Sequence, residues 1–319
     1  MHQLRDLQQS KLFQLFDHLP STIKGITLAL ISTALFTIVG VFVRQLSTDY
    51  DTFQILFFRQ LIFMLLLMPA ISKNIGVLLK PNKISLHLLR ILGAFTALYF
   101  GFISVSNIPF ADATALGFLQ VLFVALIAHF VLAEQITRSR IFTIVVGFIG
   151  VMTVVRPTFA ASHSLYVLSG VIAALGASVA VVCVRKVAQS EPKITLMAYQ
   201  ALAIGLMTLI PTLYLWRTPT VEDFILLLLV GIISSFAQYV GISAYKWAQA
   251  NIIANVEYVK IIYSLIIGLV VFSEIPDLWS MIGALIILIS ALIPLIWSHY
   301  QTTKEDNPKC RASNNFVNN

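Results

Sequence analysis

The chain has 319 residues, of which 58% are hydrophobic and only 11% are charged, and its mean hydropathy is +0.89. Soluble domains carry about 25% charged residues, so this composition excludes a single soluble domain and indicates a protein with many membrane spans. The formal net charge of +7 does not indicate nucleic-acid binding, because the basic residues fall in short segments between apolar runs.

A membrane-spanning helix needs about 20 consecutive, mainly apolar residues. By this criterion the sequence predicts ten spans, at 24–44, 52–71, 84–104, 109–133, 140–155, 164–184, 195–215, 222–245, 252–272 and 279–297. The segment 1–23 lacks a small-residue cleavage site after an apolar core, so we interpret it as a cytoplasmic segment and not a cleaved signal. The tail 298–319 is rich in Asn, Lys, Asp and Ser and is predicted to be disordered and cytoplasmic.

The distribution of Lys and Arg predicts the orientation of the chain. If the N-terminus is cytoplasmic, sixteen of these residues fall on the cytoplasmic side and only Arg44, Arg156 and Arg217 fall outside. Arg59 and Lys260 lie within spans and are not counted. Because cytoplasmic loops of membrane proteins are enriched in Lys and Arg, we predict a multi-pass inner-membrane protein with both termini in the cytoplasm.

The two halves of the sequence resemble each other at an offset of 140 residues. The matched pairs are Gln60 with Gln200, Gly101 with Gly241, Phe118 with Tyr258, Gln120 with Lys260 and Glu134 with Glu274, while GVFVRQ matches VVCVRK at an offset of 141. Chance similarity between apolar helices is the alternative. Since five spans are an odd number, a second copy would be inverted, as in many secondary transporters. We therefore predict an all-α membrane protein of ten helices in two inverted five-helix repeats, 24–157 and 164–297.

An acid and a base lie inside the ninth predicted span. Glu257 and Lys260 are three residues apart and so share a helix face, which continues through Ser264 and Gly268. A charge near the bilayer centre costs at least about 2.5 to 3.5 kcal/mol, so such residues usually face a partner or a wet cavity. We expect Lys260 to contact an anionic group of a substrate and Glu257 to tune it or relay a proton. The alternative is an internal ion pair that only fixes helix packing.

Further polar side chains within spans extend this candidate site. Arg59 in the second span either points inward as a second cationic contact or extends its guanidinium to the outer interface. In the eighth span, Gln238 and Tyr239 belong to a polar face that favours a cavity, although such groups also bond to their own helix. Gln120 in the fourth span is added because it occupies the repeat position of Lys260.

The sequence contains no signature of a soluble enzyme, metal site or cofactor site. It has no HExxH, GxSxG, GxxxxGK[ST] or paired CxxC motif, and His129 stands alone on an apolar helix. Its two cysteines, Cys183 and Cys310, do not form a disulfide framework. We expect no enzyme activity, no metal and no cofactor.

Several motifs resemble those of bacterial EamA-type members of the drug/metabolite transporter superfamily. They are Ile108-Pro109-Phe110-Ala111-Asp112-Ala113, Leu132-Ala133-Glu134, Gly147-Phe148-Ile149-Gly150-Val151 leading to Arg156-Pro157, and the set Tyr258, Gly268, Phe272 and Glu274. The resemblance extends from Lys24 to Trp297 and is closest to the branch of S-adenosylmethionine and riboflavin uptake carriers. It implies ten helices in two inverted repeats, structural roles for Glu134, Glu274 and Gly268, and a site that includes Tyr258.

The expected function is secondary transport of a small polar or zwitterionic metabolite, such as an S-adenosylmethionine-, riboflavin- or amino-acid-like compound, by alternating access. The alternatives are a broad-specificity drug, metabolite or amino-acid exporter and a membrane protein resembling a lipid-linked sugar translocase. The lipid bilayer and a small-molecule substrate are the expected partners. Proton coupling or exchange, and a monomer or homodimer, remain open alternatives.

Overall fold

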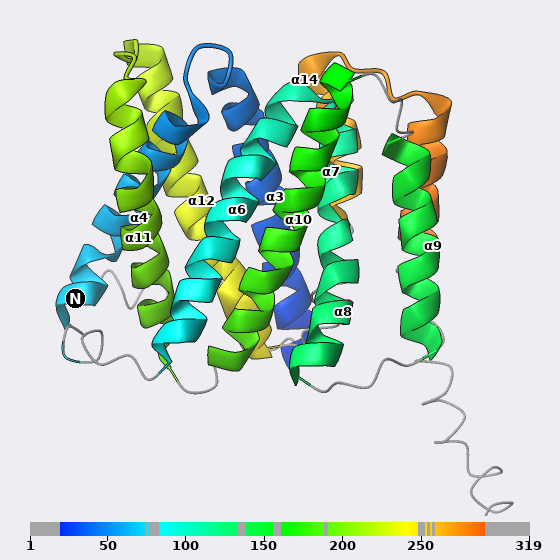
Figure 1. Cartoon of the computed structure of the whole chain (residues 1–319), viewed down its shortest axis with the longest axis horizontal. Coiled ribbons are helices and arrows are strands. Elements are labelled where there is room, and N and C mark those ends of the chain that lie inside the picture. The colour runs from blue at the N-terminus through cyan, green and yellow to red at the C-terminus, as the bar shows by residue number, and fades with distance from the viewer. Residues whose placement is uncertain are drawn as a thin grey trace, which may run out of the picture.

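The computed structural model describes residues 20–73, 76, 83–132, 138–155, 161–187, 191–247, 253, 256 and 259–290. Within these residues every regular element is an α-helix, and the helices form an elongated bundle (Figure 1). This confirms the predicted all-α membrane fold. Six helices hold an apolar stretch long enough to cross a bilayer, namely α3 (Ser21–Leu46), α4 (Thr52–Lys73), α6 (Ile84–Asn107), α10 (Ala161–Val187), α11 (Lys193–Tyr214) and α12 (Val221–Trp247).

The remaining described helices are shorter. They are α7 (Phe110–Gly117), α8 (Leu119–Leu132), α9 (Arg138–Val155), α14 (Val259–Phe272) and an unlabelled helix, Leu278–Ser290. Large apolar side chains such as Leu65, Leu206 and Ile210 are more than half exposed on the outside of the bundle. In a membrane protein these side chains contact lipid, so their exposure is not unfavourable.

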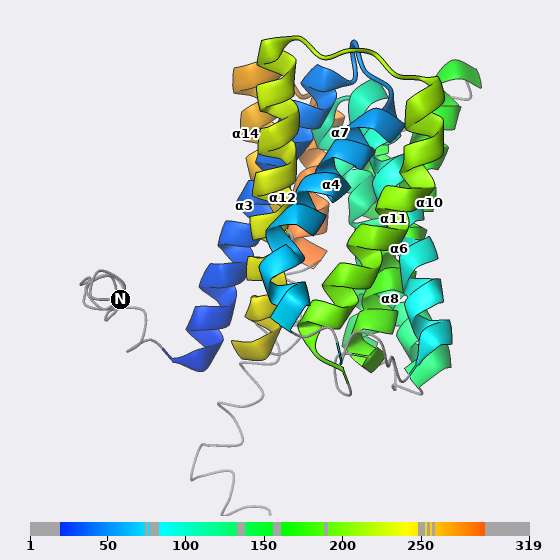
Figure 2. The ribbon, with the colours of Figure 1, turned by 90° about the vertical axis from the view of Figure 1, so that its left-hand side faces the viewer.

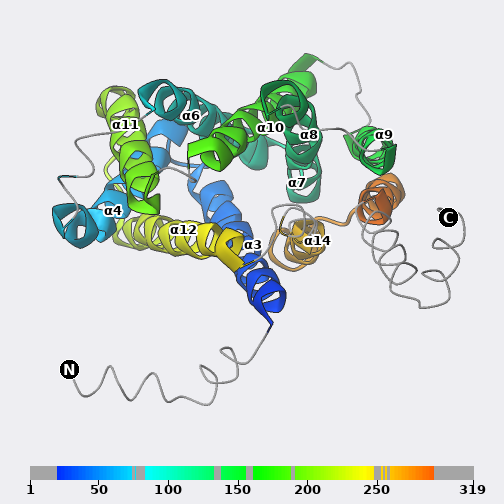
Figure 3. The same cartoon turned by 90° about the horizontal axis from the view of Figure 1, so that it is seen from below.

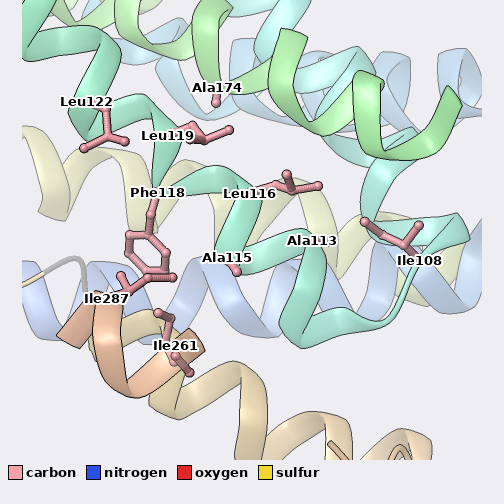
Figure 4. Close-up of a cluster of buried hydrophobic side chains, with 11 residues drawn as sticks. Ile108, Ala113, Ala115, Leu116, Phe118, Leu119, Leu122, Ala174, Ile261 and Ile287 are labelled. Carbon is pink, nitrogen blue, oxygen red and sulfur yellow. The ribbon is translucent and has the colours of Figure 1, made fainter. Parts of the chain in front are cut away.

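The fourth predicted span consists of α7 and α8, with a break between them that the prediction did not include. The helix is interrupted at Phe118, whose amide donates to the carbonyl of Ala115 at 3.0 Å in a tight turn between α7 and α8. The Phe118 side chain points toward Ile287 and lies in one buried apolar cluster with Ile261 (Figure 4). The break thus coincides with a tertiary contact of the Phe118 ring, which the local sequence does not predict.

The long helices pair across the two repeats. Helix α6 packs along α10 and helix α3 packs along α12, so each repeat contributes one member to each pair. Figure 2 shows α4 between α12 and α11, and Figure 3 shows α9 beside the helix Leu278–Ser290 at one edge of the bundle. This exchange of partners is the arrangement that two inverted repeats produce.

One end of the bundle, which we call the Arg44 end, holds the connections 47–51, 108–109, 215–220 and 273–277 (Figure 1). There the Tyr50 hydroxyl donates to Asp223 Oδ2 at 2.8 Å, and the Gln54 amide exchanges two hydrogen bonds with the backbone of Arg217. Burial of Tyr50, followed by its hydrogen bond to Asp223, raises the pKa of the hydroxyl. These contacts fix the α3–α4 connection against the α11–α12 connection at this end.

Helices α6 and α10 approach most closely where two glycines face each other. A Cβ atom on Gly93 would lie 2.7 Å from the Gly176 carbonyl oxygen, and one on Gly176 would lie 2.8 Å from that of Gly93. Backbone atoms cannot move aside as a flexible side chain can. Small residues at a helix crossing allow such an approach in membranes.

We therefore predict that Gly93→Val and Gly176→Val each lower the free energy of unfolding by about 1 to 3 kcal/mol or more, because overpacking forces the helices apart. Thermal unfolding of the purified protein in detergent measures this loss. Gly117→Ala is the control, since a Cβ atom there meets nothing within 4 Å. Equal stability of the three variants would contradict the prediction.

Candidate functional site

A polar network joins the two repeats inside the bundle. Arg90 on α6 is 3% exposed; its Nη2 donates to Gln200 Oε1 on α11 at 2.8 Å, and its Nη1 donates to the carbonyl of Leu196. The same Gln200 oxygen lies 3.5 Å from Nε2 of Gln238 on α12, a long hydrogen bond. A guanidinium from the first repeat is thus held by acceptors from the second.

A second buried pair lies near the end of the bundle opposite Arg44. His87 Nε2 on α6 is 2.8 Å from Glu191 Oε2, which precedes α11, and the two side chains are only 5% and 3% exposed. The ring of Tyr199 packs on His87 with a centroid distance of 5.1 Å. This contact also joins the first repeat to the second, and it closes the bundle beside the network of Arg90.

At the Arg44 end, one carboxylate joins three helices. Glu274, which follows α14, forms an ion pair with Arg44 on α3 and accepts a hydrogen bond at 2.9 Å from the amide of Phe110, the first residue of α7. The Arg44 guanidinium also lies 4.5 Å from the ring centroid of Phe272. A carboxylate is favourable at a helix N-terminus, so charge and helix dipole both stabilise this contact.

The backbone conformation after α14 directs the Glu274 side chain toward Arg44 and the Phe110 amide. Helix α14 ends at Phe272, Ser273 takes a left-handed conformation at φ 53°, and the Glu274 amide then donates to the Gly268 carbonyl at 2.9 Å. Gly40 on α3 leaves room for the Phe110 ring, which a Cβ atom would meet at 3.0 Å. We call the contact of Arg44, Glu274 and Phe110 the Arg44 lock.

A cavity of about 340 Å³ adjoins the Arg44 lock. Its lining is Pro109, Ala111, Asp112, Leu265, Gly268, Glu274, Ile275, Pro276, Asp277 and Ser280. These residues come from α7, from α14 and from the loop and helix after α14. The cavity therefore lies where elements of the two repeats meet, and the ion-paired Glu274 forms part of its wall.

Arg59 and Gln60 on α4 are both buried, at 3% and 0% exposed. The Arg59 guanidinium does not extend to the outer surface, so the inward alternative describes its position. Its Nη1 and both amide atoms of Gln60 are buried without a hydrogen-bond partner in the described part of the chain. A guanidinium in this state is unusual, because buried charges are normally paired.

The other predicted site residues take different positions. Lys260 on α14 and Gln120 in the first turn of α8 are half-buried, whereas Tyr239 is 60% exposed on α12. Ser264 is fully buried and donates to the carbonyl of Ile261 on its own helix. Glu134, Glu257 and Tyr258 lie outside the described residues.

Sequence reasoning missed the partners that hold the two repeats together. Arg44 was counted outside and Arg90 among the sixteen cytoplasmic basic residues, so both served only to orient the chain, while His87 and Glu191 were not considered. Gln200 was noted only as the repeat match of Gln60. Arg90 lies six residues after the start of the third span at Ile84, and this depth is the signal that could have identified it.

A bundle of two inverted helical repeats with charged groups between the repeats is the architecture of a secondary transporter. The model of the EamA-like transporter family matches the chain twice, at residues 23–156 and 164–296. The chain belongs to this family of membrane transporters and is not an enzyme.

Two curated relatives carry transporter names. The pseudopaline exporter CntI of Pseudomonas aeruginosa is 27% identical over 274 residues, covering 84% of this chain and 94% of the relative. The S-adenosylmethionine uptake transporter of Rickettsia prowazekii is 27% identical over 282 residues, covering 88% and 95%. A crystal structure matches 86% of this chain and 98% of its own with a TM-score of 0.66, and its 18% identity supports the fold alone.

The acceptor Gln200 is predicted to matter more for stability than its neighbour Gln238. Gln200→Leu leaves the buried Arg90 guanidinium short of an acceptor and is expected to cost about 1 to 3 kcal/mol of unfolding free energy. Gln238→Leu removes only the 3.5 Å contact and is expected to cost less. Thermal unfolding in detergent ranks the variants.

Gln60→Leu is the matched control for this series, since Gln60 occupies the corresponding repeat position but has no partner to lose among the described residues. Its stability is expected to equal or exceed that of the wild type, because a buried amide without a partner is unfavourable. A loss as large as that of Gln200→Leu would contradict the assigned network.

Proposed function

We propose that the protein is a secondary transporter that carries a small polar or zwitterionic metabolite across the inner membrane by alternating access. The observation that carries this proposal is the set of buried hydrogen-bonding groups between the repeats, centred on Arg90, Gln200 and Gln238. Polar groups inside a membrane bundle are costly, so they usually mark a substrate or ion pathway. Without Arg90, which is buried inside the bundle, fifteen basic residues against three support cytoplasmic termini and an outward-facing Arg44 end.

Lys260 and Gln120 support a route along the interface between the repeats. They occupy matching repeat positions on α14 and α8, and both are half-buried. A half-buried ammonium attracts a carboxylate or phosphate of the cargo, and an amide can both donate to it and accept from it. Glu257 and Tyr258 remain part of the proposed site on the sequence alone.

The relatives define the substrates worth testing but not the direction of transport. One is named for uptake of S-adenosylmethionine and the other for export of pseudopaline. We propose a metabolite of the S-adenosylmethionine- or amino-acid-like class as cargo. Both uptake and export of the cargo are therefore measured.

Purified protein in proteoliposomes is expected to move labelled S-adenosylmethionine or an amino acid, with and without a pH gradient. Lys260→Ala is expected to reduce the initial rate about tenfold or more, since hydrogen bonds to a charged group are among the stronger ones. Lys186→Ala, at an exposed basic residue on α10, is the control and should stay within about twofold. Wild-type transport by Lys260→Ala would contradict the site.

Alternating access requires the Arg44 lock to open when the cavity faces outward. Glu274→Gln removes the charge of the ion pair but keeps an oxygen for the Phe110 amide. The ion pair is 20–25% exposed, so its loss is expected to shift the equilibrium by about 1 kcal/mol, or roughly fivefold, toward the open end.

The measurement is the labelling rate of Ser264→Cys by a membrane-impermeant maleimide in a background without Cys183 and Cys310. Ser264 is fully buried on α14, one turn before Gly268 of the cavity lining, and cysteine is close to it in size. Asp277→Asn is the control, because it removes an equal charge from the same cavity wall. Faster labelling in both variants, or in neither, would show that the Arg44 lock does not gate access.

A further inference from the structure

The two adjacent residues Arg59 and Gln60 leave several buried polar atoms without partners. Arg59 Nη1 and Gln60 Oε1 and Nε2 are buried, and none has a hydrogen-bond partner in the described part of the chain. Among the described residues, Arg44 pairs with Glu274 and His87 contacts Glu191, and neither contact involves Arg59. A positive charge is therefore held inside the bundle without an opposite charge from the described residues beside it.

The other deeply buried arginine shows how the bundle satisfies a structural guanidinium. Arg90 is also 3% exposed, but it donates to the Leu196 carbonyl and to Gln200. Burying an ion without a partner is strongly unfavourable, whereas a paired ion is tolerated. The difference indicates that Arg59 has a partner that is not part of the described chain.

The first repeat does not reproduce the partners that Gln200 has in the structure. Its repeat match, Gln200, is held by Arg90 and Gln238. At the offset of 140 residues, the positions that correspond to these partners are Val230 and Leu98, which have no polar side-chain atoms. If the two repeats exchanged conformations, Val230 and Leu98 would take the places of Arg90 and Gln238 beside Gln60. Neither could form a hydrogen bond with its side chain.

Neighbouring contacts place this part of α4 against the second repeat. Ile62, three residues after Arg59 on α4, packs on Gly231 of α12, where a Cβ atom would lie 2.6 Å from the Ile62 Cβ. A Cβ atom on Gly205 of α11 would lie 3.6 Å from that of Gln60. The pair thus lies on a helix of the first repeat that faces two helices of the second.

We propose that Arg59 and Gln60 form a buried subsite for a carboxylate group of the transported metabolite. The planar guanidinium donates two parallel hydrogen bonds to a carboxylate, and the Gln60 NH₂ supplies a further donor. A lysine would supply only a point charge without this geometry. This inference rests on the proposed transport function and narrows its cargo to metabolites that carry a carboxylate.

The test measures binding to the whole purified protein and does not depend on transport. Thermal unfolding is followed with a thiol-reactive dye in a Cys310→Ser background, where the buried thiol of Cys183 reports unfolding. The probes are acetate, glutamate and succinate, each compared at constant ionic strength with its neutral amide, acetamide, glutamine or succinamide. Ligands that bind the folded state raise the unfolding temperature, and the dose dependence gives the apparent Kd.

The carboxylates are expected to stabilise the wild type more than their amides. Arg59→Gln is expected to raise the apparent Kd for a carboxylate at least tenfold and to remove the preference, while Arg59→Lys retains part of it. Lys186→Gln removes an exposed charge and should leave the preference unchanged. A wild type that shows no preference, or an Arg59→Gln variant that keeps it, would overturn the proposal.

Two further arms identify other partners. Added phosphatidylglycerol that stabilises the wild type but not Arg59→Gln, and that displaces the carboxylates, would assign the subsite to a lipid headgroup and overturn a cargo site. Glu257 lies outside the described residues, so Glu257→Gln is combined with Arg59→Gln. If the double variant regained the stability lost in the single variants, the partner would be the protein's own carboxylate, and the proposal would again be wrong.

The same measurements separate this proposal from the proposed function. Suppose that the wild type binds carboxylates through Arg59 but moves no labelled metabolite in proteoliposomes. The subsite then stands, and the proposed transport function is wrong. If transport of a carboxylate-bearing metabolite continues at the wild-type rate in Arg59→Gln, the subsite is wrong and the transport function stands.

Discussion

The structure depends on one constraint: inside a bilayer, every buried polar group must find its partner within the protein or its ligand. Many Ser and Thr side chains meet this constraint on their own helix, whereas several charged side chains meet it across the boundary between the repeats. Arg90 bonds to Gln200, His87 pairs with Glu191, and Arg44 pairs with Glu274. Because each partner comes from the other half of the chain, any movement of one repeat against the other must break some of these contacts.

The contacts at the two ends of the bundle differ in what breaking them exposes. The side chains of Arg44 and Glu274 are 20% and 25% exposed, so separation allows both charges to be hydrated. His87 and Glu191 are 5% and 3% exposed, and their separation would leave two groups buried until water enters. The desolvation cost of unpaired buried groups therefore favours opening at the Arg44 end over opening at the His87 end.

The sequence predicted the helices well and the contacts poorly, for physical reasons. Apolar length and helix ends are local properties, so the bounds of α4 and α6 lie close to the predicted spans. The pairing of Arg44 with Glu274 joins positions 230 residues apart, and no local pattern encodes it. The break at Phe118 follows packing against Ile287, which lies on another helix. The depth of Arg90 could be read from the predicted span 84–104, but its partners Leu196 and Gln200, more than 100 residues away, could not.

The two repeats match at some positions and differ at others, and the two kinds of position have different physical requirements. Gly101 matches Gly241 in sequence and Glu134 matches Glu274, and such matches are expected where two inverted halves form equivalent helix crossings. A metabolite has no such symmetry, so groups that bind it are free to differ between the halves. At the offset of 140 residues, Arg59 is matched by Tyr199 and Lys260 by Gln120. Neither cation therefore has a charged residue at the matching position of the other repeat. A symmetric scaffold can therefore carry cations that the symmetry of the two repeats does not relate to each other.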